Sequence, residues 1–380
     1  PTETKHFRSH PWEAPADLID GEPDHPYAVV GLRALREAWE ELAGYLERGR
    51  LRYRRRRDEN LLIVTAAGTL KPTYLVPGTM SANVDAWESK APTLVVGFER
   101  HADFAPELVA RNLSPRWPGI RATRLDPHQL IEQPRRIGST GLGALFERPE
   151  FREGVAEQLR PRLGNAAFVG FPAVLGFDGA LAALDHLEQL LGVRVFEIPL
   201  LSPSLPGMRL GDLLKQDLLE MGVDCRQGRA VVRLERAGGR IRAAVRQGTE
   251  RSELFEGDSF ILATGRFFGE GLVAERGAIR EPLLDLPVEA PRRRDDWHMS
   301  RFLGAPGHPI NRVGVQTDRE LRPAAAGAAL FDNLRAAGAL LAHQDWVREK
   351  SGAGVAVVTG YRAAELSLGN GAPRGARGAS

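Results

Sequence analysis

The sequence contains a single cysteine, Cys225, among its 380 residues. One cysteine excludes an internal disulfide and a zinc site built from several thiolates. It also argues against a self-contained iron–sulfur cluster, which usually needs four cysteines. Redox chemistry in this chain would therefore depend on an organic cofactor, and onward electron transfer would be left to another chain.

Long apolar runs and a strong charge of one sign are also missing. No run approaches the roughly 20 residues that span a bilayer, and the N-terminal PTETKHFRSH is not a signal peptide. The formal net charge is +2. The basic runs at 54–57 and 292–294 are each followed by acidic residues, which favours a solvated surface over a binding site for an acidic partner.

The length and composition suit a globular protein with two interleaved domains. A chain of 380 residues exceeds a typical single domain, and 43% hydrophobic residues support a large core. In the first half, apolar runs at 93–98, 166–171 and 193–198 predict buried strands, and the patterns at 151–163 and 179–191 predict helices. This half mixes strands and helices without a regular repeat.

The second half contains an ordered pattern that ends in a glycine turn. Residues 208–221 predict a helix, and a hairpin around Gly238–Gly239 follows. The apolar strand FILA at 260–263 then runs directly into Thr264–Gly265. A buried strand that ends in small residues lets the backbone approach a flat or phosphorylated ligand closely. An ordinary strand followed by a tight turn explains the same letters equally well.

Another glycine-rich pattern opens the last predicted helix. Ser351, Gly352, Ala353 and Gly354 precede an apolar helix, and small residues around Gly338 come shortly before them. Glycines at a helix start expose N–H groups, and the helix dipole favours an anion there. The N1/O2 edge of a reduced flavin carries developing negative charge, so this helix start would suit it. A close helix-packing turn is the alternative interpretation.

The order of these patterns resembles the flavoproteins with two dinucleotide-binding folds. More specifically, the chain is similar to the B subunits of anaerobic glycerol-3-phosphate dehydrogenases. The most specific match is the unusual run FFGEGLVAER, which IREPL follows closely. The stretches that carry the resemblance are 25–27, 67–71, 267–276, 279–283, 314–318 and 321–323.

The resemblance implies an α/β, FAD/NAD(P)-binding Rossmann-like flavoprotein fold with an interleaved α+β substrate or cap domain. The family begins with a strand and a G-x-G-x-x-G turn for the cofactor phosphates, and the first hundred residues lack such a turn. Because the sequence starts at Pro1, we expect it to begin about 40 to 50 residues late, the length of an opening strand–turn–helix segment. Weakened binding of the flavin phosphates is the alternative.

The domain order that the resemblance implies alternates between two parts. We expect residues 1–205 to form mostly the substrate or cap domain, with remnants of the flavin domain. We expect flavin-domain segments at 206–268 and 313–368, a second cap segment at 269–312, and a disordered tail at 369–380.

The cofactor that the resemblance implies is a flavin, FMN or FAD. We expect it between Thr264–Gly265, Gly338 and the helix start at Ser351, Gly352, Ala353 and Gly354. Oxidation of sn-glycerol 3-phosphate to dihydroxyacetone phosphate sends a hydride from C2 to the flavin and the hydroxyl proton to a base.

The substrate site needs a base and cations for a phosphate dianion. His343 is the candidate base, and a histidine without catalytic duty is the alternative. The candidate cations in the family-like stretches are Arg276, Arg280, Arg322 and Lys71. Surface or structural ion pairs are the alternative role for each of them.

The family also implies partner chains. We expect a catalytic flavin subunit and a membrane-associated iron–sulfur subunit, which would hold this chain at the cytoplasmic face of the membrane and pass its electrons to quinone. Two other interpretations stay open: a non-catalytic interaction subunit that keeps the flavoprotein fold, and a stand-alone FAD-dependent oxidoreductase acting on another small hydroxy or keto acid.

Overall fold

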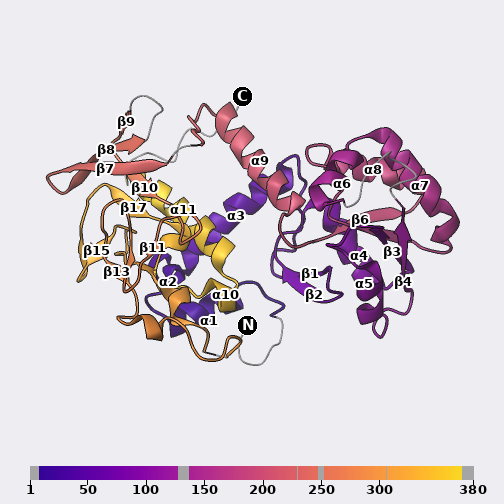
Figure 1. Ribbon diagram of the computed structural model, residues 1–380, viewed down its shortest axis with the longest axis horizontal. Helices are drawn as coiled ribbons and strands as arrows, with labels where there is room; N and C mark the ends of the chain where they lie inside the picture. Colours follow the sequence, from indigo (N-terminus) through magenta and orange to yellow (C-terminus); the bar gives the residue numbers. More distant parts are fainter. Residues whose placement is uncertain (1–7, 127–136, 229, 247–251, 305, 370–380) are drawn as a thin grey trace. The chain divides into compact units, whose positions relative to one another are not determined.

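The computed structural model describes residues 8–126, 137–228, 230–246, 252–304 and 306–369. Its contacts divide the chain into two compact units (Figure 1). Unit 1 contains Trp12–Leu42 and Arg226–Ser380, and unit 2 contains Arg8–Pro11 and Ala43–Cys225. The chain therefore begins unit 1, crosses unit 2, and returns to unit 1 for its second half. The predicted tail at 369–380 lies outside the described residues except for Gly369.

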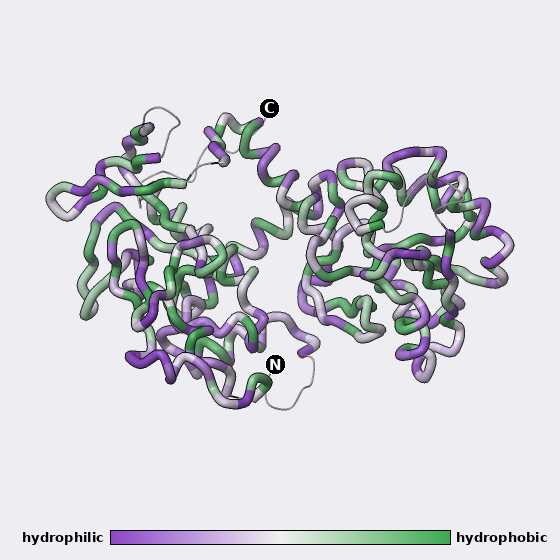
Figure 2. Tube along the Cα trace, viewed as in Figure 1, coloured by the Kyte–Doolittle hydropathy of each residue, from purple (hydrophilic) through white to green (hydrophobic). Residues whose placement is uncertain are grey.

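A four-stranded parallel sheet forms the centre of unit 2. Its strands are β3 (Thr93–Phe98), β4 (Ile120–Leu125), β5 (Phe168–Pro172) and β6 (Arg194–Ile198), in the order β4-β3-β5-β6. All six residues of β3 are buried, as expected for an inner strand with helices on both faces. Hydrophobic stretches of this unit lie in the sheet, and hydrophilic ones along its outer loops and helices (Figure 2).

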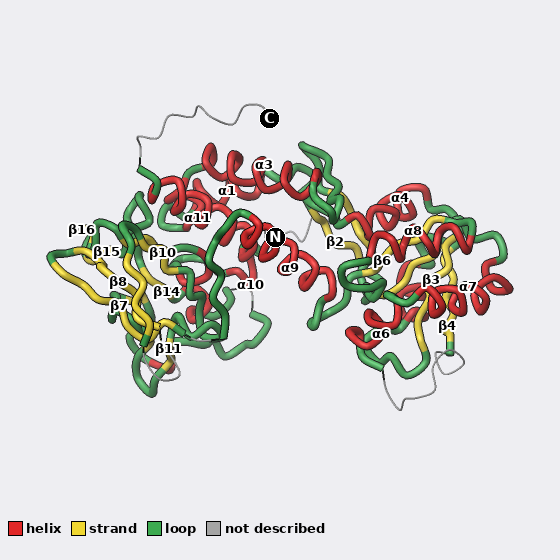
Figure 3. Tube along the Cα trace, turned by 90° about the horizontal axis from the view of Figure 1, so that it is seen from above, coloured by secondary structure: helices red, strands yellow, loops and turns green. Residues whose placement is uncertain are grey.

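Helices cover both faces of this sheet (Figure 3). Strand residues alternate between the faces: Leu94, Val96 and Phe98 pack with one set of helices, whereas Val95 packs with the other. The first set is α6 (Ser139–Phe146), α7 (Pro149–Leu163) and α8 (Ala180–Leu191), and the second is α4 (Ser81–Ser89) and α5 (Pro106–Leu113). The hairpin of β1 (Leu61–Val64) and β2 (Leu70–Thr73) completes the strands.

Helix α9 (Leu205–Glu220) belongs to unit 2, although the sequence led us to expect it to open a flavin-domain segment at residue 206. Its start is fixed there because Ser204 Oγ accepts the Gly207 N–H. Its Arg209 forms a buried ion pair with Glu197 of β6 at 2.6 Å. The boundary between the units therefore lies at Cys225/Arg226, not at 205/206.

Unit 1 is built from small sheets and helices. The three-stranded antiparallel sheet contains β7 (Val231–Ala237), β8 (Arg240–Arg246) and β9 (Glu253–Glu256), and β10 (Phe260–Leu262) pairs in parallel with β17 (Leu334–Ala336). The unit also has three antiparallel pairs of two-residue strands. Two are hairpins, β11 (Val273–Ala274) with β12 (Ile279–Arg280) and β15 (Ala324–Ala325) with β16 (Ala328–Ala329), and the third joins the distant strands β13 (Val288–Glu289) and β14 (Gly314–Val315).

The helices of unit 1 come from both ends of the sequence. They are α1 (Glu13–Gly21), α2 (Pro26–Val30), α10 (Trp346–Glu349) and α11 (Gly352–Ser367), with the first part of α3 (Leu32–Arg48). Tyr27, Leu35 and Ala38 share a buried cluster with Val355 and Val358 of α11. The N-terminal helices are thus packed on the last one.

The segment 269–312, expected as a second cap segment, packs into the core of unit 1. Leu272, Ile279 and Trp297 share one buried cluster with Leu262 of β10 and Leu334 of β17. These side chains are apolar and their backbone forms only short hairpins, so the segment gains its stability from burial against that core. The segment 269–312 therefore belongs to the same compact unit as the residues before and after it.

Candidate functional site

The carboxyl ends of β10 and β17 lie together in unit 1. Leu262 is paired with Ala336, and the Ala337 N–H donates to the Leu262 carbonyl at 3.0 Å. Thr264–Gly265 therefore leave one strand beside the point where Gly338 leaves the other. In parallel α/β structures, ligands bind outside this edge of the sheet.

The turn after β10 has open space on one side and a tight loop on the other. Gly265 has a φ of +73°, and a Cβ there would meet nothing within 4 Å. A Cβ on Gly271 would collide with the Gly265 carbonyl oxygen and lie 2.5 Å from Thr264 Oγ1. The loop thus folds back onto the turn, and only glycine fits at position 271. Gly271 belongs to the family-like run FFGEGLVAER. The sequence does not show that glycine is needed there for the loop to pack against Thr264 and Gly265.

The turn after β17 is fastened to helix α11. Gly338 has a φ of +75°, and its N–H donates to the buried Thr359 Oγ1 at 2.8 Å. A buried N–H must find an acceptor, and here a helix side chain supplies it. This bond holds the end of β17 against the N-terminal half of α11.

The start of α11 presents N–H groups without acceptors. Ser351 stands at the N-cap without a side-chain capping bond, and the N–H groups of Gly352, Ala353 and Gly354 have no acceptor within the described part of the chain. A Cβ on Gly352 would make only an ordinary contact, 3.5 Å from Trp346 Cβ. One on Gly354 would overlap Tyr27 Oη.

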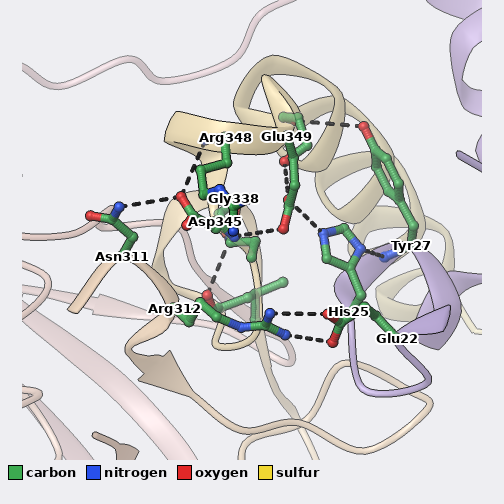
Figure 4. Close-up of polar contacts among 12 residues, drawn as sticks. Glu22, His25, Tyr27, Asn311, Arg312, Gly338, Asp345, Arg348 and Glu349 are labelled. Atoms are coloured by element: carbon green, nitrogen blue, oxygen red, sulfur yellow. Dashed lines mark hydrogen bonds and ion pairs between the residues drawn. The ribbon is translucent and has the colours of Figure 1, made fainter. Parts of the chain in front are cut away.

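A polar cluster surrounds this helix start (Figure 4). Glu349 accepts hydrogen bonds from His25 Nε2 at 3.1 Å and Ser351 Oγ at 2.7 Å, and its other oxygen accepts the Asp345 N–H at 2.9 Å. Nearby, Arg312 forms two bonds to Glu22, at 3.1 and 2.6 Å. The sequence marks 25–27 only as a family-like stretch, since the partners of His25 and Tyr27 lie 324 residues away.

The candidate substrate residues do not form one cationic cluster within the described residues of unit 1. Arg276 and Arg280 lie on the exposed β11–β12 hairpin, where Arg280 pairs with Glu275 at 2.6 Å. Arg322 lies in a turn and pairs with Asp318 at 2.8 Å. Lys71 is exposed on β2 of unit 2. The charges of Arg280 and Arg322 are thus already balanced by carboxylates.

His343, the candidate base, has a carboxylate partner. Its backbone is left-handed, with a φ of +66°, and its N–H donates to the Arg312 carbonyl at 2.9 Å. Its Nε2 lies 3.1 Å from Glu289 Oε2. That distance is within ion-pair range, but the contact does not have hydrogen-bond geometry, and the catalytic assignment stays a prediction.

Similarity to known proteins assigns the chain to a family. The family model for an FAD binding domain matches residues 2–355. A probable anaerobic glycerol-3-phosphate dehydrogenase B subunit from Halobacterium salinarum is 33% identical over 92% of this chain and 83% of its own length. The chain belongs to the family of anaerobic glycerol-3-phosphate dehydrogenase B subunits.

Other members of this B-subunit family match over a similar extent. The protein from Yersinia pestis is 33% identical over 94% of this chain and 84% of its own length. The one from Vibrio cholerae is 28% identical over 95% of this chain and 84% of its own length. No solved structure gives a significant match. The predicted family, the α/β flavoprotein class and the flavin cofactor are thereby confirmed.

The chemistry of the helix start is compatible with an electron-rich ligand edge, because the N–H groups of the first turn of α11 have no acceptor within the described residues. A Cβ on Gly265 would meet nothing within 4 Å, and one on Gly352 would only touch Trp346 Cβ. Tyr27 Oη fills the space beside Gly354, which leaves the Gly352 side for the ligand. No helix in the described ranges is long and apolar enough to cross a membrane.

Acid is expected to destabilise unit 1 through Glu349 and Glu22. Burial raises the pKa of Glu349, but hydrogen bonds from His25 and Ser351 outweigh it and the pKa falls below 4.5. The hydrogen bond from Arg312 lowers the pKa of Glu22. A carboxyl group whose pKa is lower in the folded than in the unfolded protein stabilises the fold at pH values above its unfolded-state pKa. That stabilisation is lost as the pH falls through the folded-state pKa.

We therefore expect the melting temperature to be steady above the ordinary pKa of a glutamate and to fall as the pH drops below that value. Circular dichroism melts on either side of that pH would measure the fall. The Glu349→Gln variant should show a shallower fall. An equally steep fall in that variant would contradict the assignment to Glu349.

Proposed function

We propose that this chain is a flavin-bearing subunit of an anaerobic, quinone-linked glycerol-3-phosphate dehydrogenase. It would contribute to oxidation of sn-glycerol 3-phosphate to dihydroxyacetone phosphate and pass electrons to an iron–sulfur partner. The observation that supports the proposal is that the ends of β10 and β17 lie side by side and that the turn after β17 is bonded to α11, in a chain with an FAD-binding family match.

The residues of this chain would hold the flavin by backbone rather than by side chains. The N–H groups of Gly352 and Ala353 would donate to the N1/O2 edge of the ring. Gly265 and Gly338, both with positive φ, would let the ring approach the ends of β10 and β17. A bound flavin supplies the acceptor for the hydride that leaves the substrate.

The substrate residues in this proposal are His343 and the four cations. His343, whose Nε2 lies 3.1 Å from Glu289, would take the hydroxyl proton. Arg276, Arg280, Arg322 and Lys71 would attract the phosphate, and Arg280 and Arg322 would have to exchange a carboxylate partner for it. Whether the substrate is turned over on this chain or on a catalytic flavin subunit is decided by assaying the subunits separately.

The partners in this proposal are a catalytic flavin subunit and a membrane-associated iron–sulfur subunit. A chain with one cysteine cannot supply the four thiolates of a cluster, so the onward carrier belongs to another chain. Association with that subunit would bring this one to the cytoplasmic face of the membrane. Copurification from a membrane fraction, lost on a salt or detergent wash, would test the arrangement.

Replacing Gly352 by alanine is expected to lower flavin affinity by about tenfold, or ~1.4 kcal/mol. The added methyl group clashes with nothing in the protein, so it would act on the ligand that occupies the space. Flavin absorbance per polypeptide, measured on the full-length chain with its partner subunits, gives the occupancy.

Gly360→Ala in the same helix is the matched control, since a Cβ there also meets nothing within 4 Å. It should retain flavin and stabilise α11 by roughly 0.5–1 kcal/mol. Equal flavin content in both variants would contradict the proposed flavin site at the start of α11. A correctly folded wild-type protein without flavin would overturn the proposed function itself.

A further inference from the structure

The Glu349 carboxylate joins three parts of unit 1 at the start of α11. His25 comes from the N-cap of α2, Asp345 from the N-cap of α10, and Ser351 from the N-cap of α11 (Figure 4). Each donates one hydrogen bond to Glu349, at 2.7 to 3.1 Å. None of these contacts is needed to form α11 itself, whose first internal bond runs from the Val355 N–H to the Ser351 carbonyl.

The geometry fixes the charge on His25. The side chain is completely buried, and its Nδ1 accepts the Tyr27 N–H at 3.0 Å. A ring nitrogen that accepts a hydrogen bond carries no proton, so the proton lies on Nε2 and is donated to Glu349. The imidazole is therefore neutral, and it does not cancel the negative charge of Glu349.

The other charged groups reduce this charge but leave a net negative charge. The Arg312 guanidinium donates two hydrogen bonds to Glu22. It also attracts Glu349 and Asp345, and Arg266 attracts Asp345. Asp345 adds a second carboxylate, whose Oδ1 accepts the Arg348 N–H and an Asn311 Nδ2 hydrogen. The exposed charges of Arg348 and Lys350 face solvent. A fixed negative charge thus remains beside the first turn of α11.

Glu349 also keeps that first turn open. Serine at an N-cap normally accepts a hydrogen bond from the second or third N–H of its helix. Here Ser351 makes no such bond, and its hydroxyl instead points to Glu349, to which it donates at 2.7 Å. The N–H groups of Gly352, Ala353 and Gly354 are left for a ligand.

We propose that Glu349 is a positioning residue of the flavin site: it turns the Ser351 hydroxyl away from the α11 N–H groups, and its carboxylate lowers the reduction potential of the flavin bound there. This inference rests on the proposed function. A flavin gains electron density at its N1/O2 edge on reduction, and a nearby fixed negative charge disfavours that gain.

The test is the flavin midpoint potential of Glu349→Gln in the full-length chain purified with its partner subunits. The amide keeps the size of the side chain and removes its charge, so the potential should rise above the wild-type value. Glu365→Gln, which removes a carboxylate in the last turn of α11, where it pairs with Arg362, is the control and should leave the potential nearer to wild type.

An unchanged potential in Glu349→Gln, with flavin still bound, would overturn this inference and leave the proposed function standing. A wild-type protein without flavin would overturn both. Ser351→Ala covers the case in which Glu349→Gln does not fold, because it removes one donor to the carboxylate and keeps the charge. Its potential should stay level or fall, and a rise would contradict the role of Glu349.

Discussion

Replacing Arg209 by methionine is expected to destabilise unit 2 by about 3–5 kcal/mol. Arg209 and Glu197 are almost fully buried, with 3% and 0% of their side chains exposed. The guanidinium donates to both carboxylate oxygens, at 2.6 and 2.9 Å, and to the Gly176 carbonyl. Without the guanidinium, the carboxylate of Glu197 in β6 would be a buried negative charge without a counter-charge. Such an unpaired buried charge is strongly destabilising.

Urea denaturation followed by intrinsic tryptophan fluorescence, to which Trp117 and Trp87 of this unit contribute, would measure the loss. Arg56→Met is the matched control. Arg56 also makes two bonds to a carboxylate, Glu88, at 2.8 Å each, but both side chains are 42% exposed, so its removal should cost about 0–1 kcal/mol. Equal losses in the two variants would show that burial does not set the cost.

Replacing Gly354 by alanine is expected to destabilise unit 1 by about 1–3 kcal/mol and to lower its flavin content. The new methyl group would overlap Tyr27 Oη and lie 3.1 Å from Tyr27 Cζ. Tyr27 is buried between α2 and α11, so its ring cannot move without disturbing both helices. Thermal melts and flavin absorbance would measure the two effects.

Tyr27→Phe should rescue a large part of the Gly354→Ala loss, because it removes the atom that the methyl group meets. Alone, this change removes only a long hydrogen bond of 3.5 Å to the Ser351 carbonyl and should cost less than about 1 kcal/mol. The double variant would then be more stable than the sum of the single losses predicts. If the stability losses of the two single variants simply add in the double variant, the methyl group of Gly354→Ala does not clash with Tyr27 Oη.

The elements that the sequence predicted are those with strong local signals. The apolar runs at 93–98, 166–171 and 193–198 correspond to β3, β5 and β6, and the pattern before Thr264 corresponds to β10. Strand β4 was not predicted, because it reads IRATRL and lies at the edge of the sheet, where only its Ile120 and Leu125 are buried. A half-polar edge strand carries too little apolar signal to be recognised.

The candidate cofactor segments were predictable, and the contacts that support them were not. Gly265, Gly338 and Gly352 stand out in the sequence as small residues after strands or before a helix. The roles of Tyr27 and His25 depend on partners 324 residues away, and no local pattern reports such a distance. The same holds for Thr359, a helix threonine that acts as acceptor for the turn after β17.

The bond between His25 and Glu349 has a consequence for the order in which the protein is made. Unit 2 comes mainly from one continuous stretch, Ala43–Cys225, so it can finish folding while the ribosome still holds the rest of the chain. Helices α1 and α2 emerge earlier but must wait for α10 and α11, which follow unit 2 in the sequence. The contacts around the start of α11 therefore form after unit 2 has been made, and a polypeptide released before residue 349 would leave the buried face of α2 uncovered.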